Sequence, residues 1–116
     1  FADHFARSQR VTIYGDGSQT RDFIYVGDVV AAMVRAIEKK AGGLFNISTN
    51  TSTSVSDLYR TLGGITGHQV PIDFRSARPG DILHSRLDNR RAVEALGWRP
   101  RTDLRTGLER TIASLR

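Results

Sequence analysis

Short runs of β-branched and aromatic residues lie near the start of the chain, on both sides of a polar stretch. Residues 11–14 (VTIY) and residues 22–26 (DFIYV) both have this composition, which predicts two strands. Between them, Asp16 and Gly17 are residues that a tight turn with a positive φ angle favours. The pattern therefore predicts a strand–turn–strand unit over residues 11–26.

Apolar residues at helical spacing follow this unit directly. Asp28 is in position to cap a helix whose last turn holds Lys39 and Lys40, before Gly42 and Gly43 end it. The apolar stripe predicted for this helix consists of Val29, Val30, Met33, Ala36 and Ile37.

The same spacing predicts other helices later and earlier in the chain. Ser54 resembles a capping residue for a helix that runs to about Ile65. Asp88 is in position to cap a short helix, and Gly97 to end it. Two further helices are predicted over residues 1–9 and about 103–115.

Three more segments are predicted as strands. Residues 44–48 (LFNIS) form a nearly continuous apolar run, which is typical of a strand buried on both faces of a parallel sheet. Residues 70–74 (VPIDF) contain Pro71, which favours an edge strand, and residues 85–87 predict a brief one. Because residues 44–48 are so apolar, we expect them to need a larger sheet or to pair with a second copy of the chain, giving a homo-oligomer.

The alternation of strand and helix patterns predicts an α/β fold in one unit. No glycine-rich turn opens the chain between a strand and a helix, so we expect an incomplete Rossmann domain. The first ten residues (FADHFARSQR) contain neither an initiator methionine nor an apolar signal region. We therefore expect a fragment of a longer protein.

Composition and charge exclude several functions. The net charge is +5, but the arginines are scattered over the whole length, and nucleic-acid binding is not expected because it requires a clustered basic patch. The absence of cysteine excludes disulfides and thiolate metal sites and is compatible with a cytoplasmic origin. No run approaches the roughly 18 consecutive apolar residues of a membrane span, so no membrane association is expected.

Two motifs resemble a known family. The segment GDGSQTRDFIYVGD (residues 15–28) resembles the GDGxxxRDFxxVxD segment of the NAD-dependent sugar-nucleotide epimerases and dehydratases, which are extended short-chain dehydrogenase/reductases. The segment RPGD followed by LDNRRAVEALGWRP (residues 78–100) also resembles this family. The resemblance covers essentially the whole chain. It implies that residues 1–116 are the C-terminal, nucleotide-sugar-binding region and that the N-terminal NAD-binding part is absent.

Five substrate-binding residues follow from this resemblance. Arg21 matches the arginine that contacts the nucleotide diphosphate, and Arg78 matches a second nucleotide-binding arginine. Asp81 matches an acid that accepts a hydrogen bond from a ribose hydroxyl. The backbone around Thr12 and Tyr14 matches the segment against the base, with Tyr14 as a stacking wall. Arginine forks suit phosphates and a carboxylate suits a diol on chemical grounds alone. Each binding role has an alternative: Arg21 could be a solvated side chain, residues 78–81 an ordinary Arg-Pro-Gly-Asp turn, and Tyr14 a core residue.

The residues that would perform catalysis are missing from the sequence. The family uses a Tyr-x-x-x-Lys pair for proton transfer, but Arg35 and Ala36 stand four residues before Lys39 and Lys40. The glycines form no GxxGxxG pattern for the pyrophosphate of NAD. The three histidines lie far apart, without an acid at ligand spacing. We therefore expect no catalytic, cofactor-binding or metal-binding residue in this chain.

The parent protein implied by the resemblance is an NAD-dependent epimerase of the UDP-glucose 4-epimerase kind, acting on a UDP-sugar or another nucleotide-sugar. It would oxidise the sugar at C4 and reduce the keto intermediate from the other face. A dTDP-glucose 4,6-dehydratase or a UDP-glucuronate decarboxylase is an alternative, because the quoted motifs do not distinguish these enzymes. An alternative of another class is a non-enzymatic nucleotide-binding or oligomerisation module. The chain alone is expected to be inactive and to bind no NAD.

Overall fold

Strand β1 (Val11–Tyr14) pairs in parallel with strand β4 (Ile72–Arg75) in a computed structural model that describes residues 1–115. The register places Val11 opposite Ile72 and Tyr14 opposite Arg75. The prediction of a strand over residues 11–14 is confirmed, and the strand predicted over residues 70–74 begins two residues later.

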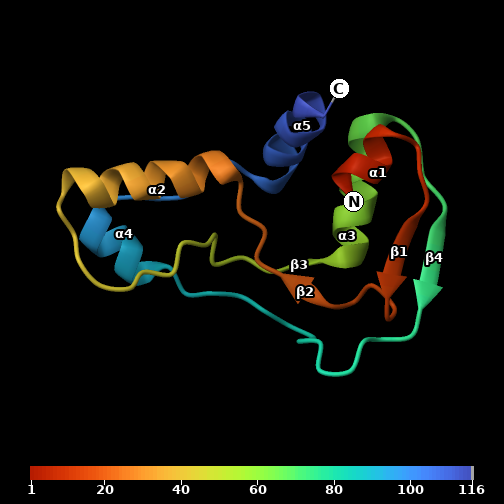
Figure 1. The fold of residues 1–116 in the computed structure, drawn as a ribbon, viewed down its shortest axis with the longest axis horizontal. Coiled ribbons are helices and arrows are strands. Elements are labelled where there is room, and N and C mark those ends of the chain that lie inside the picture. The colour runs from red at the N-terminus through yellow and green to blue at the C-terminus, as the bar shows by residue number, and fades with distance from the viewer. Residues whose placement is uncertain (116) are drawn as a thin grey trace.

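One hydrophobic core lies beside this sheet. It is covered by helices α1 (Ala2–Ala6), α3 (Val55–Thr66) and α5 (Leu104–Ser114), which contact one another (Figure 1). The ring of Phe5 is fully buried and meets the ring of Tyr59 edge to face, with the centroids 5.3 Å apart. The buried residues of this core are Phe5, Val11, Leu62, Val70 and Ile112.

A second core lies where helix α2 (Val26–Glu38) packs against helix α4 (Arg90–Leu96), at the opposite end of the molecule from β1 and β4 (Figure 1). Its buried residues are Ala32, Ala92, Leu96 and Trp98. The indole Nε1 of Trp98 donates a hydrogen bond to the backbone oxygen of Asp28 at 2.9 Å, which fixes the segment after α4 to the start of α2.

The prediction that Asp28 caps α2 is wrong. The helix begins at Val26, with Tyr25 as its N-cap and no side-chain cap bond. Asp28 lies in the first turn and is only 7% exposed. One of its carboxylate oxygens accepts hydrogen bonds from the backbone N–H groups of Arg101 (3.2 Å) and Thr102 (3.0 Å). Asp28 therefore ties α2 to the segment that leads into α5.

The predicted apolar stripe of α2 is also only partly buried. Its small residue Ala36 packs into the second core beside Ala32, which the predicted stripe did not include, whereas Val30, Met33 and Ile37 are exposed. Apolar residues lie on more than one side of α2, and the described chain packs against only one of these sides. The spacing of apolar residues in the sequence does not reveal which side that is.

The segments predicted as strands over residues 22–26 and 85–87 do not form strands. Strand β2 instead consists of Thr20–Arg21 and pairs antiparallel with strand β3 (Thr53–Ser54). Only one bridge, between Thr20 and His84, forms near the second segment. After β2 the chain is held by a side chain, because Asp22 Oδ1 accepts from the backbone N–H of Thr49 at 2.9 Å.

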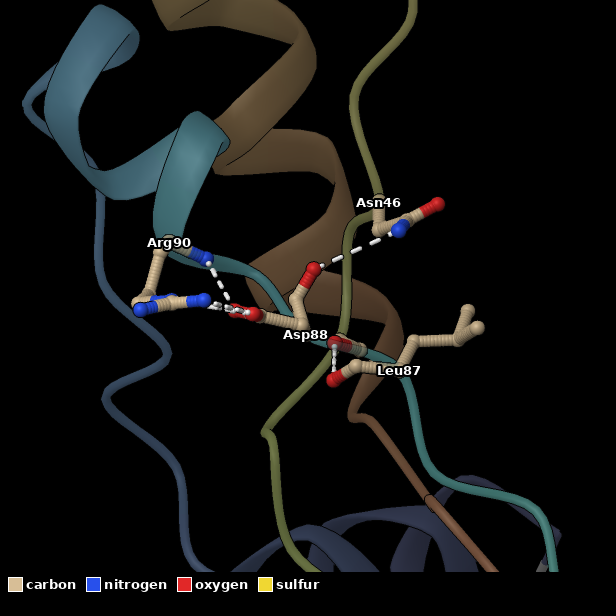
Figure 2. Close-up of polar contacts among 5 residues, drawn as sticks. Asn46, Leu87, Asp88 and Arg90 are labelled. Atoms are coloured by element: carbon tan, nitrogen blue, oxygen red, sulfur yellow. Dashed lines mark hydrogen bonds and ion pairs between the residues drawn. The ribbon is translucent and has the colours of Figure 1, made fainter.

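The strand predicted over residues 44–48 is also absent from the described fold. Side chains hold this segment against residues 87–89: Ser48 Oγ donates to Leu87 O at 2.8 Å, and Asn89 Nδ2 donates to Ser48 O at 2.7 Å. Figure 2 shows the side chain of Asn46 reaching the backbone oxygen of Asp88 from the same segment. No neighbouring strand within residues 1–115 offers the backbone ladder that an apolar run needs to become a strand.

The observed helix ends agree better with the predictions than the strands do. The Ser54 side chain accepts from the N–H of Asp57 at 3.0 Å, which confirms the predicted cap of α3. For α4 the N-cap is Asn89, one residue later than predicted, although Asp88 Oδ1 accepts from the N–H of Arg90 at 3.0 Å (Figure 2). Gly97 ends this helix in the left-handed conformation, as predicted. Among the described residues, none of the helices has the length and apolarity that crossing a bilayer requires.

Candidate functional site

All five residues predicted to bind substrate line one surface hollow with a volume of about 270 Å³. Strand β1 contributes Thr12 and Tyr14, β2 contributes Arg21, and the connection after β4 contributes Arg78 and Asp81. We refer to it as the Arg21–Arg78 hollow. Segments more than 50 residues apart in the sequence therefore meet at the position where the resemblance implies one ligand.

The alternation of side chains along β1 explains its contribution. Val11 and Ile13 are buried, whereas Thr12 and Tyr14 are half-buried. Successive side chains of a strand point to opposite faces, so Val11 enters the core while Thr12 and Tyr14 face the hollow, to which the buried Ile13 also contributes.

Arg21 is held by the short ladder between β2 and β3, where it lies opposite Thr53. Its Nη1 donates to the backbone oxygen of Thr20 at 2.7 Å, which uses one of the five N–H donors of the guanidinium. Within residues 1–115 it forms no ion pair. Arg21 is therefore half-buried and fixed in direction, with donors left for an anionic ligand.

The other arginine sits at the start of a tight turn. The N–H of Asp81 donates to the backbone oxygen of Arg78 at 3.2 Å, with Pro79 and Gly80 between them. Gly80 has a φ angle of +81°, and proline followed by glycine at positive φ is the sequence preference of a type II turn. The turn therefore brings the side chains of Arg78 and Asp81, its first and last residues, close together at one end of the loop.

The Arg78 guanidinium lies over the ring of Tyr14, with its central carbon 3.7 Å from the ring centroid. Hydrogen bonding to Arg78 and its positive charge lower the pKa of the Tyr14 phenol, and the same contact raises the pKa of Arg78. Arg78 covers one face of the ring, so a nucleotide base could stack only on the other face or after displacing the guanidinium. The stacking wall predicted for Tyr14 is therefore occupied on one side.

Sequence reasoning missed several residues of the hollow. Gln19 lines it and donates from Nε2 to the backbone oxygen of Tyr14 at 2.9 Å, which fixes the end of β1. The turn before Gln19 is shaped by Asp16, whose Oδ1 accepts from the N–H of Ser18 at 2.9 Å, and by Gly17 at a φ of +85°. The sequence did contain a signal for Gln19, because it is a polar residue inside the GDGSQTRDF motif. The apolar lining is completed by Phe1, Ile13, Phe23, Val55 and Leu58.

A second hollow of about 480 Å³ shares part of this wall. Its residues in common with the first are Tyr14, Gln19, Arg78 and Asp81. The stacked pair of Arg78 and Tyr14 is thus accessible from two hollows, which leaves room for a ligand longer than a diphosphate alone.

The chemistry of the Arg21–Arg78 hollow suits binding better than bond breaking. Two guanidinium groups provide bidentate donors for phosphate oxygens, and one carboxylate can accept from a hydroxyl. No histidine or lysine is among its described lining residues. Over residues 1–115, no three histidine, aspartate or glutamate side chains are grouped as metal ligands.

The comparisons with known proteins cover nearly the whole chain. Residues 2–111 match the sequence profile of the family described as GDP-mannose 4,6 dehydratase. A UDP-glucose 4-epimerase of Mycolicibacterium smegmatis is 40% identical over all of this chain and 37% of its own length.

Solved structures agree with this sequence match. The crystal structure of UDP-glucose 4-epimerase with UDP-glucose from Thermotoga maritima superposes with a TM-score of 0.90 and 39% identity, covering 97% of this chain and 36% of that one. The UDP-glucuronic acid 4-epimerase of Bacillus cereus, in complex with UDP-glucuronic acid and NAD, superposes with a TM-score of 0.89 and 30% identity, covering 98% and 37%.

The chain thus spans little more than a third of the length of these relatives. A profile match over most of the chain and a shared backbone at 39% identity are sufficient to establish common ancestry. The chain belongs to the GDP-mannose 4,6-dehydratase family of NAD-dependent epimerases and dehydratases, within the extended short-chain dehydrogenase/reductases, and corresponds to the C-terminal portion of these enzymes.

Proposed function

We propose that residues 1–116 form the nucleotide-sugar-binding region of an NAD-dependent epimerase of the UDP-glucose 4-epimerase kind. The observation that carries this proposal is the Arg21–Arg78 hollow, in which two arginines and a carboxylate from three separate segments meet. The similarity to epimerases that carry UDP-sugars in their crystal structures supports the choice of ligand.

In this proposal each residue has one role toward a UDP-sugar. Arg21 and Arg78 donate to the oxygens of the diphosphate, and Asp81 accepts from a ribose hydroxyl. The backbone at Thr12 lies along the base, and Tyr14 flanks it with the ring face that Arg78 leaves free. The sugar would then extend toward the residues that perform the chemistry.

The described residues do not fit NAD. The pyrophosphate of a dinucleotide is held where a strand passes through a glycine-rich turn directly into a helix. Here β1 leads through its glycine turn into β2, and β3 enters α3 without a glycine. We therefore assign NAD binding and the oxidation and reduction of the sugar to another part of the complete enzyme, which we propose to be cytoplasmic.

A comparison of the complete enzyme with the chain of residues 1–116 tests this assignment. We expect the complete enzyme to interconvert UDP-glucose and its C4 epimer, and the chain alone neither to bind NAD measurably nor to convert any UDP-sugar. Carbon dioxide release from UDP-glucuronate, or water loss from dTDP-glucose, would instead identify one of the alternative reactions. Conversion by the isolated chain, with full-length enzyme excluded, would contradict the assignment.

The exposed side chain of Leu44, at the start of the apolar run over residues 44–48, favours a second property, self-association of the isolated chain. Leu44 is 87% exposed, and the run has no strand partner among the described residues. An exposed apolar side chain on a segment without a strand partner favours contact with another copy. We expect analytical ultracentrifugation to show dimers that Leu44→Asp weakens, whereas Leu115→Asp, at an exposed apolar residue after α5, leaves them unchanged. A monodisperse monomer at all concentrations would contradict this expectation.

A further inference from the structure

The two segments that carry the arginines of the hollow meet at one point, between Thr20 and His84. The N–H of Thr20 donates to the backbone oxygen of Leu83 at 2.8 Å, and the N–H of Ser85 donates to the oxygen of Thr20 at 3.1 Å. Between these backbone bonds, Thr20 Oγ1 lies 3.0 Å from Nδ1 of His84. We refer to these contacts as the Thr20–His84 junction. Figure 1 shows the segment after β4 passing next to β2 at this point.

On the side of β2, the junction is directly connected to Arg21. The backbone oxygen of Thr20 that accepts from Ser85 also accepts from Nη1 of Arg21 at 2.7 Å. A movement of Thr20 therefore moves both the backbone of Arg21 and an acceptor that orients its guanidinium.

On the other side, the junction ends the loop that carries Arg78 and Asp81. Residues 76–82 contain no helix or strand. The loop is fixed at its start, where the N–H of Gly15 donates to Arg75 O at 2.8 Å, and at its end by the junction. Because a loop fixed at both ends has fewer conformations to lose when a ligand binds, its anchors contribute to affinity without contacting the ligand.

We propose that His84 is a positioning residue for the nucleotide-sugar site, holding the Arg78–Asp81 turn in place relative to Arg21 through the Thr20 hydroxyl. The inference rests on the proposed function and adds a residue that does not line the Arg21–Arg78 hollow. The side chain of His84 is exposed and belongs to neither core, so its removal leaves the packing intact. The hydroxyl can donate to or accept from the ring, so the contact is compatible with either protonation state of Nδ1.

The test is titration calorimetry of the complete enzyme with UDP. We expect His84→Ala and Thr20→Val to weaken binding about two- to tenfold, the effect of losing one neutral hydrogen bond. Thr20→Ser keeps the hydroxyl and should restore binding. The matched control is His68→Ala, because Nε2 of His68 makes a similar contact with Ser8 Oγ at 3.1 Å, away from the hollow. This control should leave UDP affinity unchanged.

A double variant separates positioning from general destabilisation. If His84 acts by placing Arg78, then His84→Ala should cause little further loss in the Arg78→Ala background, whereas independent effects would multiply. The positioning role would be overturned if His84→Ala bound UDP as strongly as the wild type, or if the losses of the two variants multiplied fully. A loss of binding in Arg78→Ala alone would still uphold the proposed function. No binding by the wild-type enzyme would overturn both.

Discussion

Replacing Arg78 or Arg21 with alanine is expected to weaken UDP binding by the complete enzyme roughly ten- to a hundredfold. Both guanidinium groups line one hollow, and neither is paired with a carboxylate among the described residues. A hydrogen bond to a charged group contributes about 1.5–3 kcal/mol, which corresponds to this range of affinity. Arg21→Lys should also weaken binding, because an ammonium group cannot reproduce the bidentate fork.

Arginines outside the hollow provide the controls for this titration. Arg90 pairs with Asp88 at the start of α4, with 2.8 Å between Nη2 and Oδ2, and Arg110 lies over the ring of Tyr25. Alanine variants of Arg90 and Arg110 should bind UDP as the wild type does. Equal affinities for the wild type, Arg21→Ala and Arg78→Ala would show that the two arginines do not hold the diphosphate.

Asp28→Ala is expected to lower the free energy of unfolding by about 2–4 kcal/mol, because it leaves the backbone N–H groups of Arg101 and Thr102 without their acceptor in a half-buried site. These bonds connect α2 to the segment that enters α5. Their loss removes a connection between residues that are more than 70 positions apart in the sequence. Asp3→Ala is the matched control. Its exposed ion pair with Arg7 should be worth less than about 1 kcal/mol.

Urea unfolding followed by the fluorescence of Trp98 measures this difference. The indole donates to the backbone oxygen of Asp28, so it reports on the same region of the protein. Asp28→Asn, which retains one carbonyl oxygen as acceptor, should be less damaging than Asp28→Ala. If Asp28→Ala unfolded at the same urea concentration as Asp3→Ala, the carboxylate would not be the connection that we describe.

Local signals in the sequence predicted local structure well. The alternation in residues 11–14 defined β1, and the cap at Ser54 and the glycine at position 97 marked helix ends. These features depend on a few neighbouring residues, so a single sequence contains what is needed to find them. The candidate site residues came instead from the resemblance of two motifs to a known family, although the Arg78–Asp81 turn is itself a local, four-residue unit.

The wrong predictions concern features that depend on distant partners. Residues 22–26 and 44–48 have the composition of strands, but a strand requires a backbone ladder with a neighbour. Within residues 1–115 the side chains of Asp22 and Ser48 bond to distant backbone groups instead. Asp28 has the sequence position of a helix cap, but its acceptor oxygens are used by residues far along the chain. Gln19 was missed because its hydrogen bond to the backbone oxygen of Tyr14 depends on how the turn after β1 folds back.

A crystal structure of the complete enzyme with UDP tests most directly whether the Arg21–Arg78 hollow holds the nucleotide diphosphate. We predict phosphate oxygens about 2.7–2.9 Å from guanidinium nitrogens of both Arg21 and Arg78, with a ribose hydroxyl beside Asp81. UDP bound elsewhere, with both guanidinium groups free of phosphate, would contradict the proposed function of this chain.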